Sequence, residues 1–270
     1  MTLKAWQIQK LGDPWDELEM VEADLPKPGP DTVRIQVEAA DLSFADILQC
    51  QGVYQVKLTP PFIPEMHAAG SVVAVGDNCK LVPGDRVIGP TLDTSGGYAE
   101  ASLMLAEQAF RLPLGVSSRT AAAMHVTYGT AWLALHHRGK LQPGETVLVL
   151  AAAGGVGSAA VQLARAHGCW VLAAAGGEQK TRVCTALGAD VVIDYSSQDL
   201  YDTVMNVTDG RGVDVVYDPV GGEYFDVARR LLAWEGRLLI IGFASGTIPS
   251  VPVNHLLVKS YSVIGVHMGG

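Results

Sequence analysis

The sequence predicts an α/β protein in which a β-rich first half precedes a doubly wound parallel sheet. The first observation is the segment TVLVLAAAGGVG, residues 146–157, an uncharged β-rich run that ends in glycines and leads into a helical pattern. The second is a series of further apolar strand patterns after it, most of them separated by helical patterns. Such a series is typical of a parallel sheet that helices cover on both faces. The third is the set of prolines before residue 65, which restrict helices there to short pieces.

The composition is that of a globular protein with two domains. The 270 residues suffice for two sizeable cores, and 49% of them are hydrophobic while 17% are charged. A net charge of −9 provides no general basic surface, so we expect no nucleic-acid partner and no anionic membrane partner. Residues 146–164 form an uncharged stretch as long as a membrane span, but glycines interrupt it and its period changes halfway. We therefore reject a span.

The cysteines and the first residues bear on the cellular compartment. Cys50, Cys79, Cys169 and Cys184 are scattered without a C-x-x-C pair, a pattern that favours buried thiols in a reducing compartment. The start MTLKAWQIQK has no apolar signal region. We expect a cytoplasmic location, with mitochondrial import left open.

The first half contains three strand patterns, a turn and the start of a long helix. Strands are expected over 33–40, 70–76 and 86–90, with a proline–glycine turn at 83–85. A helix is expected from the capping serines at 117–118 to Arg138, with Gly139 as its stop. We interpret His136 and His137 as helix-end residues, because adjacent helical positions point about 100° apart and do not chelate a metal easily.

From residue 142 onward, strand and helix patterns alternate. The expected strands cover 146–152, 169–175, 190–195, 213–220, 236–243 and 261–266. The expected helices begin after Gly157 and cover 178–188, 199–207 and 223–234. We place a catalytic and substrate domain at 1–123 and a nucleotide-binding domain at 124–266, with 267–270 left as a short end.

The glycine turn after the first strand of the second domain predicts a dinucleotide site. Bare backbone N–H groups and a helix N-terminus at this turn suit a pyrophosphate. The spaced pattern is Ala152-x-x-Gly155-x-Gly157, so alanine replaces the first glycine of the usual fingerprint. The residues assigned to this contact are Ala153, Gly154, Gly155, Val156 and Gly157.

The end of the second strand indicates which dinucleotide is bound. An acidic residue there would bind the adenine ribose and repel a 2′-phosphate, but the chain has Ala175, Gly176 and Gly177. Lys180 follows within a turn and could reach a phosphate as a point charge. The sequence therefore favours NADP(H) over NAD(H), with Gly176, Gly177 and Lys180 as contacts.

Several motifs together resemble the medium-chain dehydrogenase/reductase superfamily, and within it the quinone oxidoreductase (zeta-crystallin-like) family. They are VTYGTAW, AAGGVGSAAVQLA, LGADVVIDY, GRGVDVVYDPVGG and GRLLIIGFASG, and the resemblance covers essentially the whole chain. It implies a GroES-like β-rich catalytic domain followed by a Rossmann domain, and a homodimer through the sixth Rossmann strand.

The resemblance also implies roles for individual residues. It places Ser43, Asp46 and Tyr54 at the substrate, where Tyr54 could stabilise negative charge that develops on a carbonyl oxygen. For Tyr54, simple packing under a loop is an equal alternative. Family members often have Asn in place of Ser43. The cofactor contacts that the resemblance implies are Thr127, Tyr195, Pro219, Val220, Gly221, Gly242, Phe243 and Ala244.

The resemblance further indicates that the chain needs no zinc. Zinc-dependent members carry a Cys ligand where this chain has Ser43, and a His–Glu pair where it has Met66-His67. Neither serine nor methionine is a normal zinc ligand, and the four-cysteine structural lobe is missing. We expect no metal site.

The expected activity is NADPH-dependent reduction of a quinone or an activated alkene (an α,β-unsaturated carbonyl) by hydride transfer without a metal. Two alternatives stay open at this point. One is an acryloyl- or enoyl-CoA reductase of the same superfamily, for which Lys57 is the nearby basic residue. The other is a non-catalytic NADPH-binding or interaction module. Family members continue beyond IGV-x-x-G, whereas this chain stops at 268–270, so we expect weakened NADPH binding and reduced or no turnover.

Overall fold

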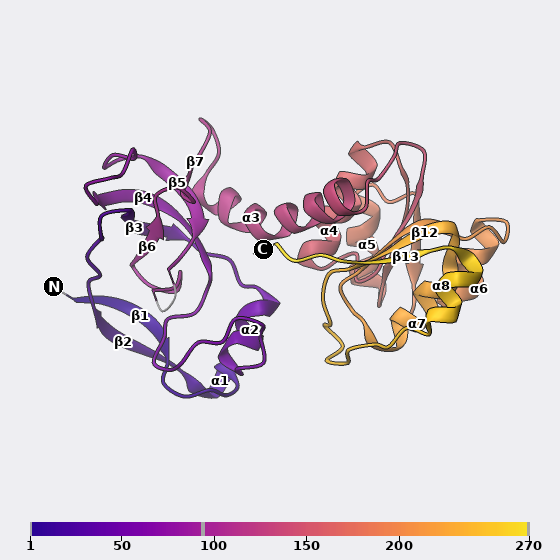
Figure 1. Cartoon of the computed structure of the whole chain (residues 1–270), viewed down its shortest axis with the longest axis horizontal. Helices are drawn as coiled ribbons and strands as arrows, with labels where there is room; N and C mark the ends of the chain where they lie inside the picture. Colours follow the sequence, from indigo (N-terminus) through magenta and orange to yellow (C-terminus); the bar gives the residue numbers. More distant parts are fainter. Residues whose placement is uncertain (1, 93–94, 269–270) are drawn as a thin grey trace. The chain divides into compact units, whose positions relative to one another are not determined.

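The computed structural model describes residues 2–92 and 95–268. It divides into two compact units, residues 1–126 and 127–270 (Figure 1). The sequence-based boundary between 123 and 124 lies three residues earlier. Of the expected short end at 267–270, residues 269 and 270 lie outside the described part.

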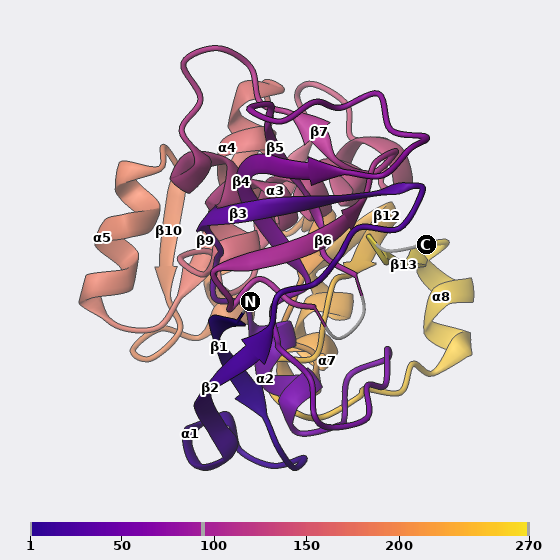
Figure 2. The ribbon, with the colours of Figure 1, turned by 90° about the vertical axis from the view of Figure 1, so that its left-hand side faces the viewer.

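The core of the first unit is an antiparallel sheet with the strand order β6-β3-β4-β5-β7 (Figure 2). Its strands are β3 (Thr32–Ala39), β4 (His67–Val75), β5 (Arg86–Pro90), β6 (Ala101–Leu105) and β7 (Phe110–Arg111). The structure confirms the alternation of apolar and polar residues that predicted β3, because Val33 and Ile35 are fully buried and pack against Val72 and Met104. The three expected strands are confirmed, while β6 and β7 had no prediction.

A smaller ribbon and two short helices complete this unit. The ribbon pairs β1 (Thr2–Ile8) with β2 (Leu18–Asp24) in antiparallel register. The helices α1 (Pro14–Glu17) and α2 (Phe44–Cys50) have four and seven residues, in line with the proline-rich sequence around them. Helix α2 positions the predicted substrate residues.

The second unit is a six-stranded parallel sheet with the order β10-β9-β8-β11-β12-β13. Its strands are β8 (Thr146–Val149), β9 (Trp170–Ala175), β10 (Val191–Asp194), β11 (Val213–Asp218), β12 (Leu232–Ile240) and β13 (Ser262–Gly265). The chain reverses direction across the sheet between β8 and β11. In open α/β sheets, ligands bind at the carboxyl ends of the strands beside this point.

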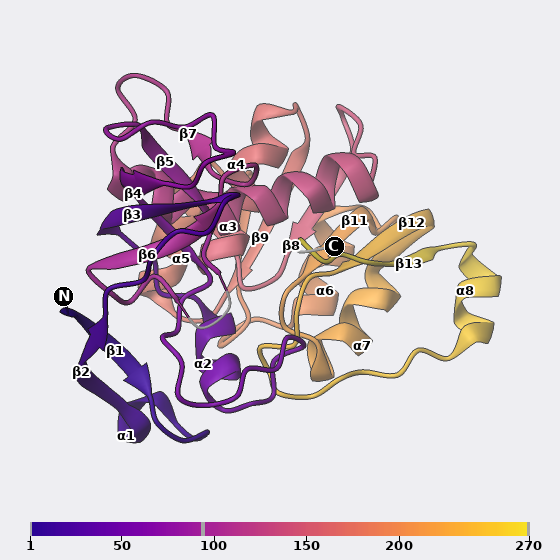
Figure 3. The same ribbon diagram turned by 60° about the vertical axis from the view of Figure 1, so that its left-hand side comes forward.

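Helices cover both faces of this sheet, as Figure 3 shows. Strand β8 and the residue after it explain why: Val147 and Val149 enter one hydrophobic cluster, and Leu148 and the following Leu150 enter the other. The first cluster includes residues of α3 (Ser118–Trp132), η1 (Leu133–Arg138), α4 (Gly155–Ala166) and α5 (Glu178–Ala186). The second includes residues of α6 (Leu200–Val207), α7 (Gly222–Leu231) and α8 (Val253–Lys259). The predicted doubly wound fold is confirmed.

Some element boundaries differ from the prediction for local reasons. Strand β8 ends at Val149 because the chain turns at Ala151, which has φ 47°. Helix α4 begins at Gly155 rather than after Gly157. The expected helix 223–234 was too long, since Leu232 pairs with Val213 and already belongs to β12.

Two further features concern helices. The long helix from residue 118 widens into the π-helical segment η1 before Gly139, where the sequence predicted its end. Helix α8 had no prediction. No helix in the described ranges combines the length and hydropathy that a membrane crossing requires.

Candidate functional site

The glycine turn between β8 and α4 forms a tight backbone cradle. A Cβ atom on Gly157 would lie 2.3 Å from the carbonyl oxygen of Ala151 and 2.9 Å from the Cα of Ala152. Only glycine therefore allows this close approach of helix to strand. Gly154 is the N-cap of α4 and supplies no side-chain acceptor, so the first N–H groups of the helix are left for a ligand.

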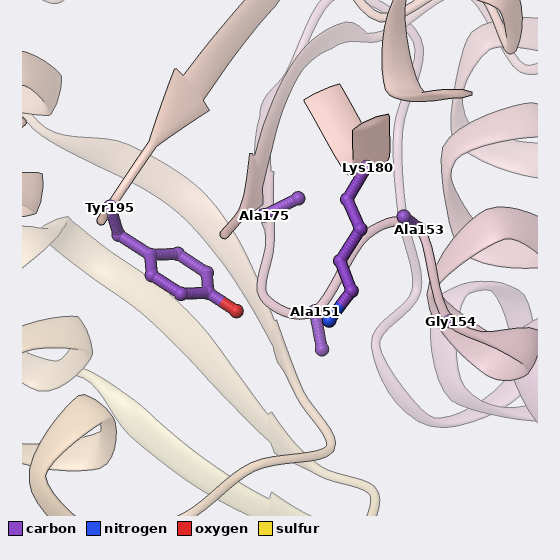
Figure 4. Close-up of a pocket in the computed structure, with 6 residues that line it drawn as sticks. All are labelled: Ala151, Ala153, Gly154, Ala175, Lys180 and Tyr195. Carbon is purple, nitrogen blue, oxygen red and sulfur yellow. The ribbon is translucent and has the colours of Figure 1, made fainter. Parts of the chain in front are cut away.

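A pocket of about 140 Å³ opens beside this turn (Figure 4). Its lining residues are Ala151, Ala153, Gly154, Ala175, Lys180 and Tyr195. In the close-up, the Lys180 amine and the Tyr195 hydroxyl both point toward the space beside the turn. No carboxylate of the described residues lines the pocket, which is therefore suited to an anion.

The charges around Lys180 and its neighbour Arg182 differ. Arg182 forms an ion pair with Glu178 one helical turn before it. Lys180 is exposed and has no ion-pair partner within the described ranges. Lys180 is thus the cation that remains for a ligand phosphate.

Asp194 at the end of β10 supports the turn that leads into helix α5, which carries Lys180. Its Oδ1 accepts the Gly177 N–H at 2.8 Å and the Ser196 N–H at 3.0 Å. The Ser196 hydroxyl and these backbone donors hold the pKa of Asp194 below its ordinary value. Sequence analysis missed this residue, although its place at the end of a parallel strand was a signal for it.

The ends of β11 and β12 bring together two further predicted segments, 219–221 and 242–244. The Ala244 N–H donates to the Pro219 carbonyl at 3.0 Å. Gly221 has φ 68°, and a Cβ there would lie 3.0 Å from the Phe243 ring. Asp218 shapes this junction, because its buried Oδ1 accepts the N–H groups of Val220 and Gly221 at 2.8 and 2.9 Å.

Thr127 lies beside the glycine turn. A Cβ on Gly155 would come within 3.1 Å of its methyl group. The second unit therefore gathers Thr127, the turn at 153–157 and the pocket residues Lys180 and Tyr195 around one cradle.

In the first unit, Ser43 and Asp46 form the N-terminal capping box of α2. The Ser43 N–H donates to Asp46 Oδ2 at 2.8 Å, and Ser43 Oγ accepts the Asp46 N–H at 3.3 Å. The Tyr98 hydroxyl donates to the same Oδ2 at 3.1 Å. Asp46 is 4% exposed, so it lies inside the unit and supports α2.

Tyr54 follows α2 and is half-buried. Its N–H donates to the Leu48 carbonyl at 3.1 Å, which ties the loop to the helix. Burial, and then the charge of Asp46, raise the pKa of the Tyr54 phenol, which favours its protonated, hydrogen-bond-donating form. The described residues offer no hydrogen-bond partner to this hydroxyl.

Three residues that sequence analysis did not single out lie in the same polar region: Asp41, Glu65 and Tyr98. Glu65 is 2% exposed and accepts the His67 N–H at Oε1 at 2.9 Å. Burial, followed by the charge of Asp46, raises the pKa of Glu65 to about 11. No spacing rule joins positions 41, 65 and 98, so no sequence pattern could have revealed this cluster.

His67 and His125 lie next to this cluster, with ring centroids 5.0 Å apart. Burial lowers the pKa of His67 to about 4, and it also lowers the pKa of His125. Both imidazoles are therefore neutral at physiological pH and contribute no positive charge.

The donor set of the first unit does not fit a zinc ion. Ser43 and Met66 offer a hydroxyl and a thioether in place of the thiolate or imidazole that zinc requires. Across residues 2–92 and 95–268, no three His, Cys, Asp or Glu side chains converge in a way that could hold a metal ion.

Two family models match the chain. The Alcohol dehydrogenase GroES-like domain matches residues 29–115, and the Zinc-binding dehydrogenase model matches residues 155–270. Both matches agree with the two units of the structure. The chain is thus a two-domain oxidoreductase of the medium-chain dehydrogenase/reductase class.

Similar proteins narrow the class further. The chain is 44% identical to quinone oxidoreductase-like protein 2 of Bos taurus, over 93% of this chain and 72% of the relative. It is 41% identical to the quinone oxidoreductase-like protein 2 homolog of Nematostella vectensis, over 89% of this chain and 66% of the relative. The chain thus spans about two thirds of the length of these relatives.

A solved structure also indicates the quinone oxidoreductase family. Escherichia coli quinone oxidoreductase, crystallised with NADPH, has a TM-score of 0.90 and 30% identity, over 99% of this chain and 82% of that one. The chain belongs to the quinone oxidoreductase-like family of oxidoreductases.

Proposed function

We propose that the chain binds NADPH and reduces a quinone or an α,β-unsaturated carbonyl without a metal. The observation that carries this proposal is the pocket beside the glycine turn, in which Lys180 and Tyr195 accompany bare backbone N–H groups and no carboxylate. The NADPH complex of the Escherichia coli relative supports the same cofactor.

The residues of the second unit would hold the cofactor by its charged groups. Residues 153–157 would bind the pyrophosphate, and Lys180 with Tyr195 would bind the 2′-phosphate. Thr127 and the segments 219–221 and 242–244 would contact the nicotinamide end. When bound, NADPH supplies the hydride, so no Lewis acid is needed for an acceptor that conjugation already activates.

The first unit would orient the acceptor. Tyr54 would donate a hydrogen bond to the acceptor oxygen as negative charge develops on it. Asp46 and Ser43 would hold α2, and thereby the loop that carries Tyr54, in place.

An acceptor comparison tests the reaction. NADPH oxidation is followed with a quinone, with an enone and with crotonyl-CoA, and calorimetry measures the binding of NADPH and NADH. We expect NADPH to bind more tightly than NADH, with turnover on the quinone or the enone. Preference for crotonyl-CoA would identify an enoyl-CoA reductase, and binding without turnover would identify a non-catalytic module.

We also propose that the protein forms a homodimer through β13. This strand lies at the edge of the sheet and pairs within the described residues only with β12. It is apolar apart from Ser262, and unpaired edge strands readily pair with a second copy. Sedimentation of the chain tests this, and a monomer at micromolar concentration would contradict it.

We further propose a reducing compartment such as the cytoplasm. All four cysteines are free thiols, three of them buried. Cell fractionation with an antibody against the chain tests this location.

A further inference from the structure

Three carboxyl groups of the first unit share one buried region. They belong to Asp41 before α2, Asp46 within α2 and Glu65 at the turn before β4. One oxygen atom of each, namely Asp41 Oδ1, Asp46 Oδ1 and Glu65 Oε2, is shielded from solvent and meets no N–H or O–H donor of the described chain. Buried polar atoms without partners are rare in native proteins.

The contacts between these groups explain the unpaired oxygens. The Glu65 carboxyl lies within hydrogen-bonding range of the Asp41 and Asp46 side chains. A carboxylate can only accept hydrogen bonds, so a hydrogen bond between two carboxyl groups requires a proton on one of them. At least one of the three groups is therefore neutral.

The surroundings indicate which group carries the proton. Asp46 Oδ2 already accepts two donors, the Ser43 N–H and the Tyr98 hydroxyl. Glu65 is the more buried group and faces two acidic neighbours. Neither His67 nor His125 supplies a compensating cation, and Tyr54 and Tyr98 are neutral phenols.

We propose that Glu65 is a protonated carboxylic acid in the native protein and that its hydrogen bond to the Asp41–Asp46 pair positions the start of α2. The direction of the pKa shift of Glu65, upward through burial and through the Asp46 charge, agrees with this assignment.

The backbone holds Glu65 in the position that this role requires. Its φ of 73° is unusual for a residue with a side chain. Its carbonyl accepts the Gly97 N–H at 2.7 Å and the Thr91 hydroxyl at 2.9 Å. Gly97 leaves room for the side chain, because a Cβ there would lie 2.8 Å from Glu65 Cγ.

The proton on Glu65 is thereby linked to helix α2 and to Tyr54, which are proposed to orient the substrate. Asp46 closes the capping box of α2, and α2 in turn holds Tyr54 through the Leu48 carbonyl. Loss of the proton would add a negative charge to the desolvated region that holds the Asp41 and Asp46 carboxyl groups, and would loosen the start of α2. The link to substrate orientation depends on the proposed function, whereas the proton itself does not.

The experiment uses the full chain with Glu65→Gln, which keeps a hydrogen-bond donor, and Glu65→Ala, which removes it. Glu107→Gln, at an exposed turn, is the matched control for the lost charge. Infrared spectra at neutral pH should show the carbonyl band of a protonated carboxylic acid in wild type and Glu107→Gln, and its loss in Glu65→Gln.

Urea unfolding as a function of pH gives an independent measurement. A group whose folded pKa is raised is ionised only in the unfolded chain between the two pKa values, so stability falls as pH rises there. From about pH 5 to about pH 9, the urea midpoint should fall more steeply for wild type than for Glu65→Gln. Parallel curves, or an infrared band that survives in Glu65→Gln, would overturn the assignment.

Activity separates this assignment from the proposed function. Glu65→Gln should keep the wild-type kcat near neutral pH and retain it further into the alkaline range, whereas Glu65→Ala should lose kcat/KM. A Glu65→Gln variant as impaired as Glu65→Ala would overturn the positioning role. If no acceptor is reduced by any variant, the proposed function fails. The infrared and unfolding data still decide whether Glu65 is protonated.

Discussion

The two units place their polar groups in opposite ways. The turn before α4 presents backbone N–H groups and the exposed Lys180 amine, with more donors than acceptors. The region around Glu65 contains three carboxyl groups and too few donors for them. The first arrangement depends on backbone shape and on an anion from outside, whereas the second depends on side chains and on a proton. Steric changes should therefore break the first, and changes in donors or in pH should break the second.

The largest effect should come from Gly157→Val. The new side chain would collide with the Ala151 carbonyl, which belongs to the backbone and cannot move aside. Overpacking of this kind costs about 3 kcal/mol, so we expect strongly reduced NADPH affinity and a lower thermal midpoint. Calorimetry and thermal unfolding measure both effects. Gly29→Ala is the control, since its Cβ would meet only Thr32 Oγ1 at 3.9 Å.

The next largest effect should come from Tyr98→Phe. It removes the hydroxyl that donates to Asp46 and so deprives the carboxyl cluster of one donor. A hydrogen bond to a charged group contributes about 2 kcal/mol, and we expect a loss of that order in urea unfolding. NADPH affinity should stay unchanged. A loss of NADPH affinity equal to that of Gly157→Val would erase the distinction between the two regions.

Lys180→Gln should give a smaller but more selective effect. It removes the ammonium that would bind the 2′-phosphate, so the Kd for NADPH should rise about tenfold, which corresponds to about 1.4 kcal/mol. The Kd for NADH should not change. Arg182→Gln is the matched control, because Arg182 already pairs with Glu178. Equal losses for both nucleotides would contradict the assignment of Lys180.

The smallest effect should come from Asp194→Ala. It removes the acceptor of the Gly177 N–H and loosens the loop before Lys180 without touching the phosphate contact itself. We expect a weaker loss of NADPH affinity than for Lys180→Gln. Asp194→Asn should restore most of it, because the amide oxygen can still accept. A loss larger than that of Lys180→Gln would show direct contact with the nucleotide.

The sequence predicted the second unit better than the first. Its strands are continuous apolar runs, and the turn at 153–157 needs glycine for steric reasons, so composition and spacing reveal both. The buried polar cluster of the first unit contains Asp41, Glu65 and Tyr98, which lie far apart in sequence and meet only after folding. The predicted element boundaries were wrong where strand pairing outweighed the local sequence pattern. Leu232, for example, belongs to β12 and pairs with Val213, although the sequence around it is typical of a helix.

The contact between Gly176 and the Tyr195 ring has an evolutionary consequence. A Cβ on Gly176 would lie 2.8 Å from Tyr195 Cε2, so the aromatic side chain keeps that position free of any larger residue. A descendant that adopted the unphosphorylated nucleotide through an acidic side chain at residue 176 would first have to shrink or displace the tyrosine. The proposed NADPH preference would therefore depend on two positions, and a change at Tyr195 would have to precede the change at Gly176.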